Sequence, residues 1–245
     1  MVNVIFLGTG GWVTSPYRKF QCIFIQNDDD VLVLECGAFT SEQFSIYKPL
    51  LDKVKAIVIT HMHGDHVSGL PSLLFYMKFS GFSGTIDILT PQQYLEFLGD
   101  MCDQYIKAAP FEVTMREIKA PQTYHVASYT ISFYEVEHSV YNVGCKIKVG
   151  DKVIGYSSDT RLCRGLETIA QNADLLICEA SFTTSMREKA YEVGHLTPYD
   201  ALIIFKKAKA KQLVLSHIGF EPYLETTNFE GHPVIWASDN MIITL

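Results

Sequence analysis

The sequence predicts an α/β protein in which residues 1–245 form one domain, with two sheets packed back to back and helices outside them. Three observations predict this class. Short β-branched runs alternate with segments of helical periodicity, and this order occurs in both halves of the chain. No linker or low-complexity stretch separates the halves. With 48% hydrophobic and 19% charged residues, the chain can build a sizeable core.

The first half is expected to begin with three strands and one helix. An apolar run at 2–7 ends in a glycine-rich loop at 8–12, whose glycines permit close approach to a ligand or another loop. The loop lacks the GxGxxG spacing of a dinucleotide site. Strands at 21–26 and 31–35 are joined by an acidic turn, and a helix follows at 41–51.

The remaining elements follow from the same patterns. A strand at 55–59 precedes alternating helices and strands, then a region of consecutive strands with a tight turn at Gly150 and Asp151, and finally another alternating region. The expected helices are 69–79, 91–104, 162–171 and 197–207. The expected strands are 85–90, 111–118, 129–136, 145–149, 152–157, 174–178 and 212–216.

Three histidines and an aspartate follow the 55–59 run. The segment reads Thr60-His-Met-His-Gly-Asp-His66 and holds three of the eight histidines in the chain. His61 and His63 are two apart and point the same way from an extended segment, whereas Asp65 and His66 follow a turn at Gly64 and face a second point. A chance cluster in a polar loop is the alternative. Four ligands offered to two points predict two metal ions.

Further candidate ligands follow three later strands, where a rigid scaffold places convergent side chains. They are His138, Asp159 and His217. One metal ion is then expected on His61, His63 and His138, and the other on Asp65, His66 and His217, with Asp159 bridging. Imidazole and carboxylate ligands without thiolate suit Zn²⁺, and Mn²⁺ or Fe²⁺ are compatible with the same ligand types.

Several motifs together resemble ribonuclease Z of the metallo-β-lactamase superfamily, over nearly the whole chain. They are Phe6-Leu-Gly-Thr-Gly10, Ile59-Thr-His-Met-His-Gly-Asp-His66 with Gly69-Leu-Pro71, His138, Ser157-Ser-Asp-Thr-Arg161, Ala173-Asp-Leu-Leu-Ile-Cys-Glu-Ala-Ser-Phe182, Gly194-His-Leu-Thr197 and Ser216-His217. The histidine motif at 61–66 is specific only to the superfamily. SDTR followed by GHLT points to the ribonuclease Z-like phosphodiesterases, whereas true β-lactamases and glyoxalase II lack this combination.

The resemblance implies a four-layer αβ/βα sandwich, two zinc ions, hydrolysis of a phosphodiester bond and a homodimer. His195 matches the family's non-ligand histidine, which helps the leaving group to depart. In the same mechanism Asp65 orients or deprotonates the attacking water, and Glu179 orients His195 or a ligand imidazole. The apolar segment 73–79 has more hydrophobic surface than one core-facing stripe needs and is the expected dimer contact.

Two departures from the family pattern bear on the substrate. The stretch 35–40 reads ECGAFT, where the family usually has DCGEGTQ, and few residues separate His138 from Asp159, where tRNA-processing members carry an arm that grips tRNA. With 20 basic and 27 acidic residues, the net charge of −7 gives no broad cationic field for long nucleic acid. We therefore expect a hydrolase of small or cyclic nucleotide phosphodiesters or short RNA. A tRNA 3′-processing endoribonuclease is the alternative, and a non-catalytic metal-binding module is less favoured.

The other signals are weaker. The sequence has no apolar run of about 20 residues and no signal peptide at its N-terminus, which predicts a cytoplasmic protein without a membrane span. The six cysteines form no CxxC pair and are expected in the core. His125 and His232 have no partner pattern, and Phe220 and Tyr223 either stack on a base at the rim of the site or pack internally.

Overall fold

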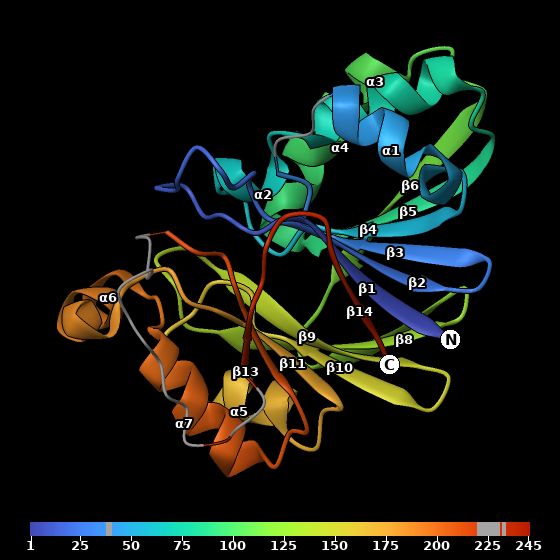
Figure 1. Cartoon of the computed structure of the whole chain (residues 1–245). Coiled ribbons are helices and arrows are strands. Elements are labelled where there is room, and N and C mark those ends of the chain that lie inside the picture. The colour runs from blue at the N-terminus through green and yellow to red at the C-terminus, as the bar shows by residue number, and fades with distance from the viewer. Residues whose placement is uncertain (38–40, 220–230, 232–233) are drawn as a thin grey trace.

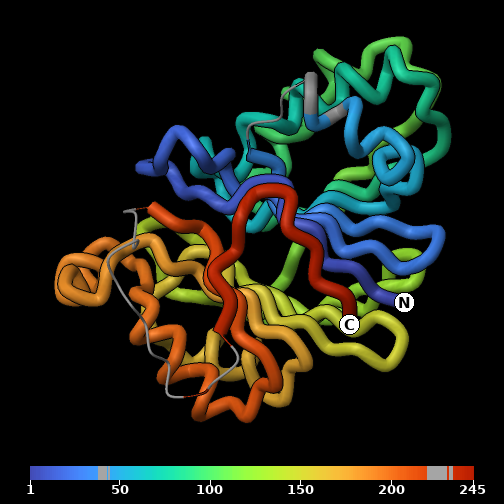
Figure 2. The backbone as a smooth tube through the Cα atoms, in the orientation of Figure 1, coloured from blue at the N-terminus to red at the C-terminus, as the bar shows by residue number. Residues whose placement is uncertain are grey.

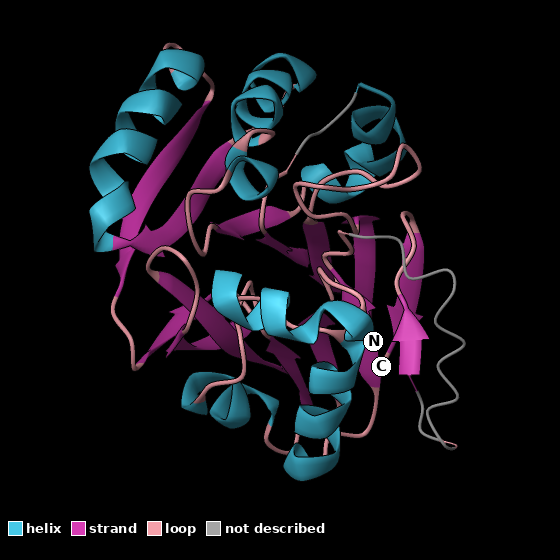
Figure 3. Cartoon of the chain, turned by 90° about the vertical axis from the view of Figure 1, so that its left-hand side faces the viewer, coloured by secondary structure: helices cyan, strands magenta, loops and turns pink. Residues whose placement is uncertain are grey.

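The structure is a computed structural model that describes residues 1–37, 41–219, 231 and 234–245. Two seven-stranded sheets lie face to face between two layers of helices (Figures 1 and 3). The predicted α/β class is confirmed, and the order of the layers is the αβ/βα sandwich that the family resemblance implies. Among the described residues, no helix is long and apolar enough to cross a membrane.

The first sheet contains six strands from the first half of the chain and one from its C-terminal part. In spatial order they are β14 (Met241–Thr244), β1 (Val2–Gly8), β2 (Cys22–Asn27), β3 (Asp30–Leu34), β4 (Val54–Val58), β5 (Gly84–Pro91) and β6 (Phe111–Ile118). The pairs from β14 to β3 are antiparallel, and those from β3 to β6 are parallel. The acidic turn between β2 and β3 is where the sequence predicts it.

The second sheet has the same division into a parallel and an antiparallel side. In spatial order its strands are β13 (Val234–Trp236), β12 (Leu213–Ser216), β11 (Leu175–Glu179), β10 (Lys152–Tyr156), β9 (Asn142–Val149), β8 (Tyr129–Val136) and β7 (Gln122–Val126). Strands β10 to β13 are parallel, and β7 to β10 are antiparallel. Gly150, at a φ of 59°, closes the predicted tight turn between β9 and β10.

Helices cover the outer face of each sheet. Over the first sheet lie α1 (Ser41–Leu51), α3 (Leu70–Ser80) and α4 (Gln92–Ile106), and over the second lie α5 (Arg164–Ala170) and α7 (Pro198–Ala208). Three shorter helices belong to the loops at one edge of the sheets: α2 (Gly64–Val67), η1 (Thr184–Met186) and α6 (Arg187–Val193). Each helical layer buries an apolar cluster of its own against its sheet.

The central core lies between the two sheets and takes side chains from both. Val4, Phe6 and Ile25 of the first sheet share one buried cluster with Ile131 and Phe133 of the second. Alternation along each strand sends the intervening side chains to the helical layers. All six cysteines are free, and burial raises the pKa of the Cys22 and Cys36 thiols well above the ordinary value. The core role predicted for the cysteines is confirmed for the five that are buried.

The C-terminal segment joins the sheets. Strand β13 pairs with β12 in the second sheet, and β14 then pairs with β1 in the first (Figure 2). In the turn between them, the Asp239 carboxylate accepts hydrogen bonds from the Thr9 backbone, the Thr9 hydroxyl and the Lys19 backbone, at 3.0, 2.8 and 2.7 Å. Asp239 thereby ties together the two ends of the loop that follows β1.

The predicted elements are largely confirmed, with boundaries that shift by a few residues. Among the described residues, six elements lie where the sequence patterns predict no helix or strand: α2, η1, α6, β7, β13 and β14. The reason given for Gly64 is wrong, because residues 64–67 form a helical turn and Gly64 is not among the residues with positive φ. A Cβ at Gly64 would lie 2.7 Å from Cζ3 of Trp12, so glycine is needed there for a close contact.

Candidate metal centre and active-site cavity

The segment after β4 carries four of the predicted ligands. His61 and His63 extend from the strand end, and His61 Nε2 lies 3.0 Å from His63 Nδ1. Asp65 and His66 lie on α2, the helical turn that follows. His61, Asp65 and His66 are buried, while His63 is partly accessible. The chain changes direction sharply between the strand end and α2, so the pair His61 and His63 and the pair Asp65 and His66 face two different positions.

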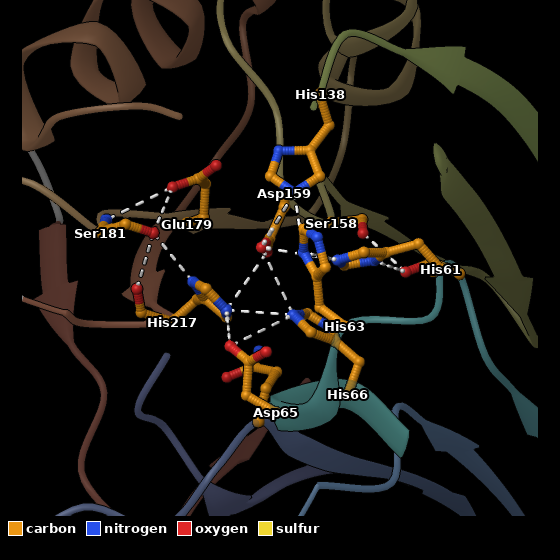
Figure 4. A network of polar contacts seen from close by, with 12 residues as sticks. His61, His63, Asp65, His66, His138, Ser158, Asp159, Glu179, Ser181 and His217 are labelled. Carbon is orange, nitrogen blue, oxygen red and sulfur yellow. Dashed lines mark hydrogen bonds and ion pairs between the residues drawn. The ribbon is translucent and has the colours of Figure 1, made fainter. Parts of the chain in front are cut away.

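Three loops of the second sheet bring the remaining ligands to the same place (Figure 4). His138 follows β8, and its Nε2 lies 3.1 Å from His63 Nδ1. His217 follows β12, and its Nε2 lies 3.0 Å from His66 Nε2 and 3.0 Å from Asp65 Oδ2. The expectation that strand ends converge thus holds for all seven residues.

The seven residues form two clusters that meet at Asp159. The first consists of His61, His63, His138 and Asp159, and the second of Asp65, His66 and His217, and the ligand atoms within each lie within 4.8 Å of one another. Asp159 Oδ2 is 3.4 Å from His66 Nε2 and 3.7 Å from His61 Nε2, while Oδ1 is 3.3 Å from His217 Nε2. Its carboxylate therefore contacts both clusters.

The donor set fits divalent cations. Two ligands of a tetrahedral zinc ion at about 2.1 Å from the metal lie about 3.4 Å apart, close to the spacing of these ring nitrogens. Asp159 is 2% exposed, and its Oδ1 accepts no hydrogen bond from any described residue. A buried carboxylate oxygen without a donor is costly unless a cation compensates it. The chain thus presents a divalent metal site.

Burial and charge act differently on the two clusters. Burial, reinforced by the neighbouring His66, lowers the pKa of His61 well below its ordinary value, and burial also lowers the pKa of His63 and His138. These imidazoles are therefore neutral, as metal ligands must be. Burial also opposes charge on His66, but Asp159 and Glu35 outweigh it and raise the pKa of His66 well above the ordinary value. The surplus of negative charge there favours a cation.

Hydrogen bonds behind the imidazoles fix which ring nitrogen faces the clusters. His138 Nδ1 donates to the Gly194 carbonyl at 2.9 Å. Ser181 Oγ donates its one proton to Glu179, so that it accepts from His217 Nδ1 at 2.8 Å. Both rings are therefore held at Nδ1 and turn Nε2 toward the clusters, the arrangement that orients histidine ligands in metal proteins. His63 alone presents Nδ1 to the other rings.

Glu35, at the departure from the family pattern, contacts the ligand segment. Its buried Oε1 accepts a hydrogen bond from the Thr60 hydroxyl at 2.5 Å and lies 3.5 Å from His66 Nδ1. Thr60 Oγ1 also lies 3.1 Å from His61 Nδ1. Glu35 has a φ of 60°, a conformation that costs free energy in residues other than glycine. The altered loop therefore still supports two of the ligand histidines, a role that sequence reasoning did not assign to Glu35.

His195 and Glu179 lie together beside the clusters. Gly194, at a φ of 82°, ends α6, and His195 follows with its Nδ1 3.0 and 3.1 Å from the two carboxylate oxygens of Glu179. Burial opposes charge on His195, but the Glu179 carboxylate outweighs burial and raises the pKa of His195 to about 9. Glu179 also accepts the Ser181 hydrogen bond at 2.6 Å. It thus contacts His195 directly and reaches His217 through Ser181.

A cavity of about 430 Å³ opens onto the ligand clusters. His63, Asp65, Asp159, His195 and His217 line it, together with the loop residues 11–13, Phe182 and others. A Cβ at Gly11 would lie 2.7 Å from the His217 ring, which confirms the predicted close approach of the glycine-rich loop. Sequence reasoning assigned no role in the site to Trp12, at the end of the glycine-rich loop, or to Phe182, the last residue of the 173–182 motif.

Among the remaining candidates, the structure describes only His125, which does not join the site. His125 lies on β7 with an exposed side chain, and its Nδ1 is 3.2 Å from Thr130 Oγ1. His125 is thus a surface residue, as expected. Phe220, Tyr223 and His232 lie outside the residues that the structure describes.

The fold and the site define a class: proteins in which two sheets, sandwiched between helices, hold divalent metal between their loops. The chain belongs to the beta-lactamase superfamily, since the family described as "Beta-lactamase superfamily domain" matches residues 31–218. Ribonuclease Z of Methanothermobacter thermautotrophicus is 26% identical, with 89% of this chain and 87% of the relative covered. Ribonuclease Z of Pyrococcus abyssi is 28% identical, with 92% and 90% covered.

Solved structures share the whole fold. The metallo-beta-lactamase fold protein YhfI from Bacillus subtilis superposes with a TM-score of 0.86 at 21% identity, over 99% of this chain and 98% of that one. The short form of human tRNase Z superposes with a TM-score of 0.81 at 25% identity, again over 99% and 98%. The two sheets and their flanking helices are therefore those of the metallo-β-lactamase fold.

Proposed function

We propose that this chain is a metal-dependent phosphodiesterase of the ribonuclease Z type, acting on small or cyclic nucleotide phosphodiesters or short RNA. The observation that supports this most is the position of His195. Its Nδ1 is held by Glu179, 3.0 Å away, and the ring lines the same cavity as the ligand clusters. Hydrolysis of a phosphodiester needs a proton for the departing oxygen, and His195 is placed to donate it from Nε2.

Two zinc ions are the metals that we propose. His61, His63 and His138 would hold one ion and Asp65, His66 and His217 the other, with Asp159 shared. Mn²⁺ and Fe²⁺ are the alternatives, because they bind the same types of ligand. When bound, the metals lower the pKa of water and neutralise the charge that develops on phosphate. Each cluster combines residues that follow a strand of the first sheet with residues that follow a strand of the second.

Two residues of the chain would carry out the two proton transfers, one from the attacking water and one to the leaving oxygen. The Asp65 carboxylate lies 3.0 Å from His217 and lines the cavity, where it can orient the attacking water and accept its proton. His195 donates to the leaving oxygen on the other side, and Glu179 stabilises the charged imidazole before the transfer. A non-catalytic metal-binding module would need neither the oriented proton donor nor an open cavity beside it.

The substrate class follows from what surrounds the site. The segment from His138 to Asp159 contains little more than the β9–β10 hairpin, which leaves no room for a long inserted arm. The alignment with the Methanothermobacter ribonuclease Z runs over 266 positions, more than the 245 residues of this chain, so that relative has segments that this chain lacks. Few spare cations and no arm favour small or short substrates over tRNA precursors.

A substrate panel tests the proposal. Purified zinc-loaded protein should hydrolyse bis-nitrophenyl phosphate and short or cyclic nucleotides, and cleave precursor tRNA weakly, with little dependence on salt because few phosphates are contacted. Efficient removal of a tRNA 3′ trailer at submicromolar substrate would instead establish the tRNA-processing alternative. No hydrolysis of any phosphodiester, with both metals bound, would overturn the proposal.

We further propose that the chain is a homodimer that associates through α3. Leu73, Leu74 and Met77 of this helix are buried, whereas Phe75 and Phe79 are 51% and 71% exposed and contact each other with ring centroids 4.8 Å apart. Their exposure is compatible with a contact between subunits. A cytoplasmic location remains a prediction from the sequence.

A further inference from the structure

Trp12 is an exposed aromatic residue held rigidly beside the ligand segment. Its side chain is 66% exposed, although one face of the indole stacks on Phe20 at a centroid distance of 5.5 Å and an interplanar angle of 15°. The ring edge rests against Gly64, between the ligands His63 and Asp65. Because Phe20 covers one face, the exposed area belongs to the other face and the free edges.

The backbone around Trp12 is fixed from several sides. Gly11 donates to the Ile218 carbonyl at 3.3 Å, next to the ligand His217. Gly10 donates to the Lys19 carbonyl at 2.8 Å, and Asp239 holds Thr9 and Lys19 at the ends of the loop. An aromatic ring ordered in advance loses little conformational freedom when a ligand stacks on it.

Two aromatic side chains line the cavity beside the metal ligands. Trp12 contacts Gly64, and the ring centroid of Phe182 lies 5.7 Å from that of His195. No Lys or Arg is among the described residues that line the cavity. Apart from the metals, such a cavity holds an organic substituent by stacking and not by ion pairs.

We propose that Trp12 is a specificity-determining residue that stacks on a nucleobase of the substrate. This inference rests on the proposed function, in which the leaving oxygen departs beside His195, whereas the indole of Trp12 contacts Gly64, between the ligands His63 and Asp65. The base on Trp12 then belongs to the substituent that stays on the phosphate. Phosphodiesters with a nucleoside in that position are the preferred substrates, and a simple alkyl group there loses the stacking energy.

A pair of substrates with the same leaving group tests this assignment. Thymidine 5′-nitrophenyl phosphate and methyl nitrophenyl phosphate differ only in the group that stays on the phosphate. Trp12→Ala should lower kcat/KM for the thymidine ester by about 10–100-fold, the usual value of one stacked base, and leave the methyl ester within about twofold. Trp12→Phe should recover most of the loss.

Tyr17→Ala is the matched control, because Tyr17 lies on the same loop and is 81% exposed but does not line the cavity. It should leave both esters unchanged. If Trp12→Ala lowers kcat/KM equally for both esters, Trp12 merely supports the ligand turn and the assignment is wrong. It is equally wrong if Trp12→Ala affects neither ester, or if the wild type does not prefer the thymidine ester.

A binding measurement separates this inference from the proposed function. Trp236→Phe leaves Trp12 as the only tryptophan, because the chain has two. In this variant, thymidine monophosphate should quench the fluorescence saturably, whereas methyl phosphate should not. Quenching without hydrolysis of either ester would refute the phosphodiesterase but keep the stacking site. Hydrolysis without quenching would keep the phosphodiesterase and overturn the role of Trp12.

Discussion

At the scale of single residues, the proposed mechanism depends on His195 as a proton donor that is not a metal ligand. His195→Ala should lower kcat for a substrate with a strongly basic leaving group by about 10²–10⁴-fold, the usual contribution of a positioned acid. The loss should shrink for a nitrophenyl ester, whose leaving group departs without protonation. Metal analysis of the same variant is the control. A variant that loses metal would show that His195 is a ligand.

The Glu179 carboxylate controls the proton of His195. Burial lowers the pKa of His195, but the Glu179 carboxylate outweighs burial and raises the pKa to about 9. The protonated imidazole is therefore present at neutral pH and is lost as the pH rises through that value. Glu179→Gln removes the negative charge and lowers the pKa, so the falling limb of the pH–rate profile should move to lower pH. A limb that stays in place in this variant would mean that another group titrates there.

Ser181 fixes one ligand from behind. Its hydroxyl donates to Glu179 at 2.6 Å and accepts from His217 Nδ1 at 2.8 Å. Ser181→Ala should lower the affinity for the metal ion held by His217 by about 10–100-fold, the usual effect of removing such a hydrogen-bond partner. Competition with a chelator measures this affinity. Ser185→Ala, on the same loop with an exposed hydroxyl, should have no effect.

At the scale of elements, Asp239 holds the loop that carries Gly11 and Trp12. Asp239→Ala removes three hydrogen bonds to Thr9 and Lys19 and should destabilise the fold by about 1–3 kcal/mol, measured by denaturant unfolding. Because the loop lines the cavity, KM should rise as well. Asp103→Ala, at an exposed position of α4, should stay within about 0.5 kcal/mol of the wild type. Equal effects of both variants would argue against the role of the Asp239 contacts.

The elements that the sequence predicts are those with long, regular patterns. The run before His61 can be recognised because it is a continuous apolar stretch and nearly all of it is buried, and β8 because buried residues alternate along most of its length. Strands β13 and β14 have three and four residues with half-exposed side chains, too few to show a period. They are strands because a neighbour pairs with them, which is information outside their own sequence.

The same division holds for the site. The ligands are predictable because metal chemistry restricts them to histidine and acids, and because each follows a strand that can be recognised. Glu35, Ser181 and Trp12 are not, since their contacts with His66, His217 and Gly64 join segments far apart in the chain. Each pair follows two strands of one sheet, so it is the pairing of strands within a sheet that brings these residues together.

At the scale of the whole molecule, the proposed metals link the two halves of the chain. The ligands after β4 belong to the first sheet, and His138, Asp159 and His217 belong to the second. We expect about two zinc ions per chain by metal analysis, and a single unfolding transition whose Tm falls on chelation and rises with added zinc, because only the folded chain offers the complete site. One ion or none in a folded sample would contradict the two-metal assignment.

The dimer proposal predicts a change in mass from a surface substitution. The wild type should have the mass of a dimer by light scattering at micromolar concentration, and Phe79→Glu should give monomers, since a charge cannot be buried in an apolar contact without large cost. Tyr17→Glu introduces the same charge at an exposed aromatic residue of another surface and should leave the dimer intact. A monomeric wild type would exclude association through α3.

The contact between Trp12 and Gly64 also constrains how such a chain can evolve. Because a Cβ at position 64 would lie 2.7 Å from Cζ3 of the indole, a side chain can be acquired at 64 only if the ring at position 12 shifts or is lost. We therefore expect the two positions to be epistatic. Among homologues, a non-glycine residue at the position of Gly64 should coincide with a small residue at the position of Trp12, and the substrate preference set by the indole should be absent from those lineages.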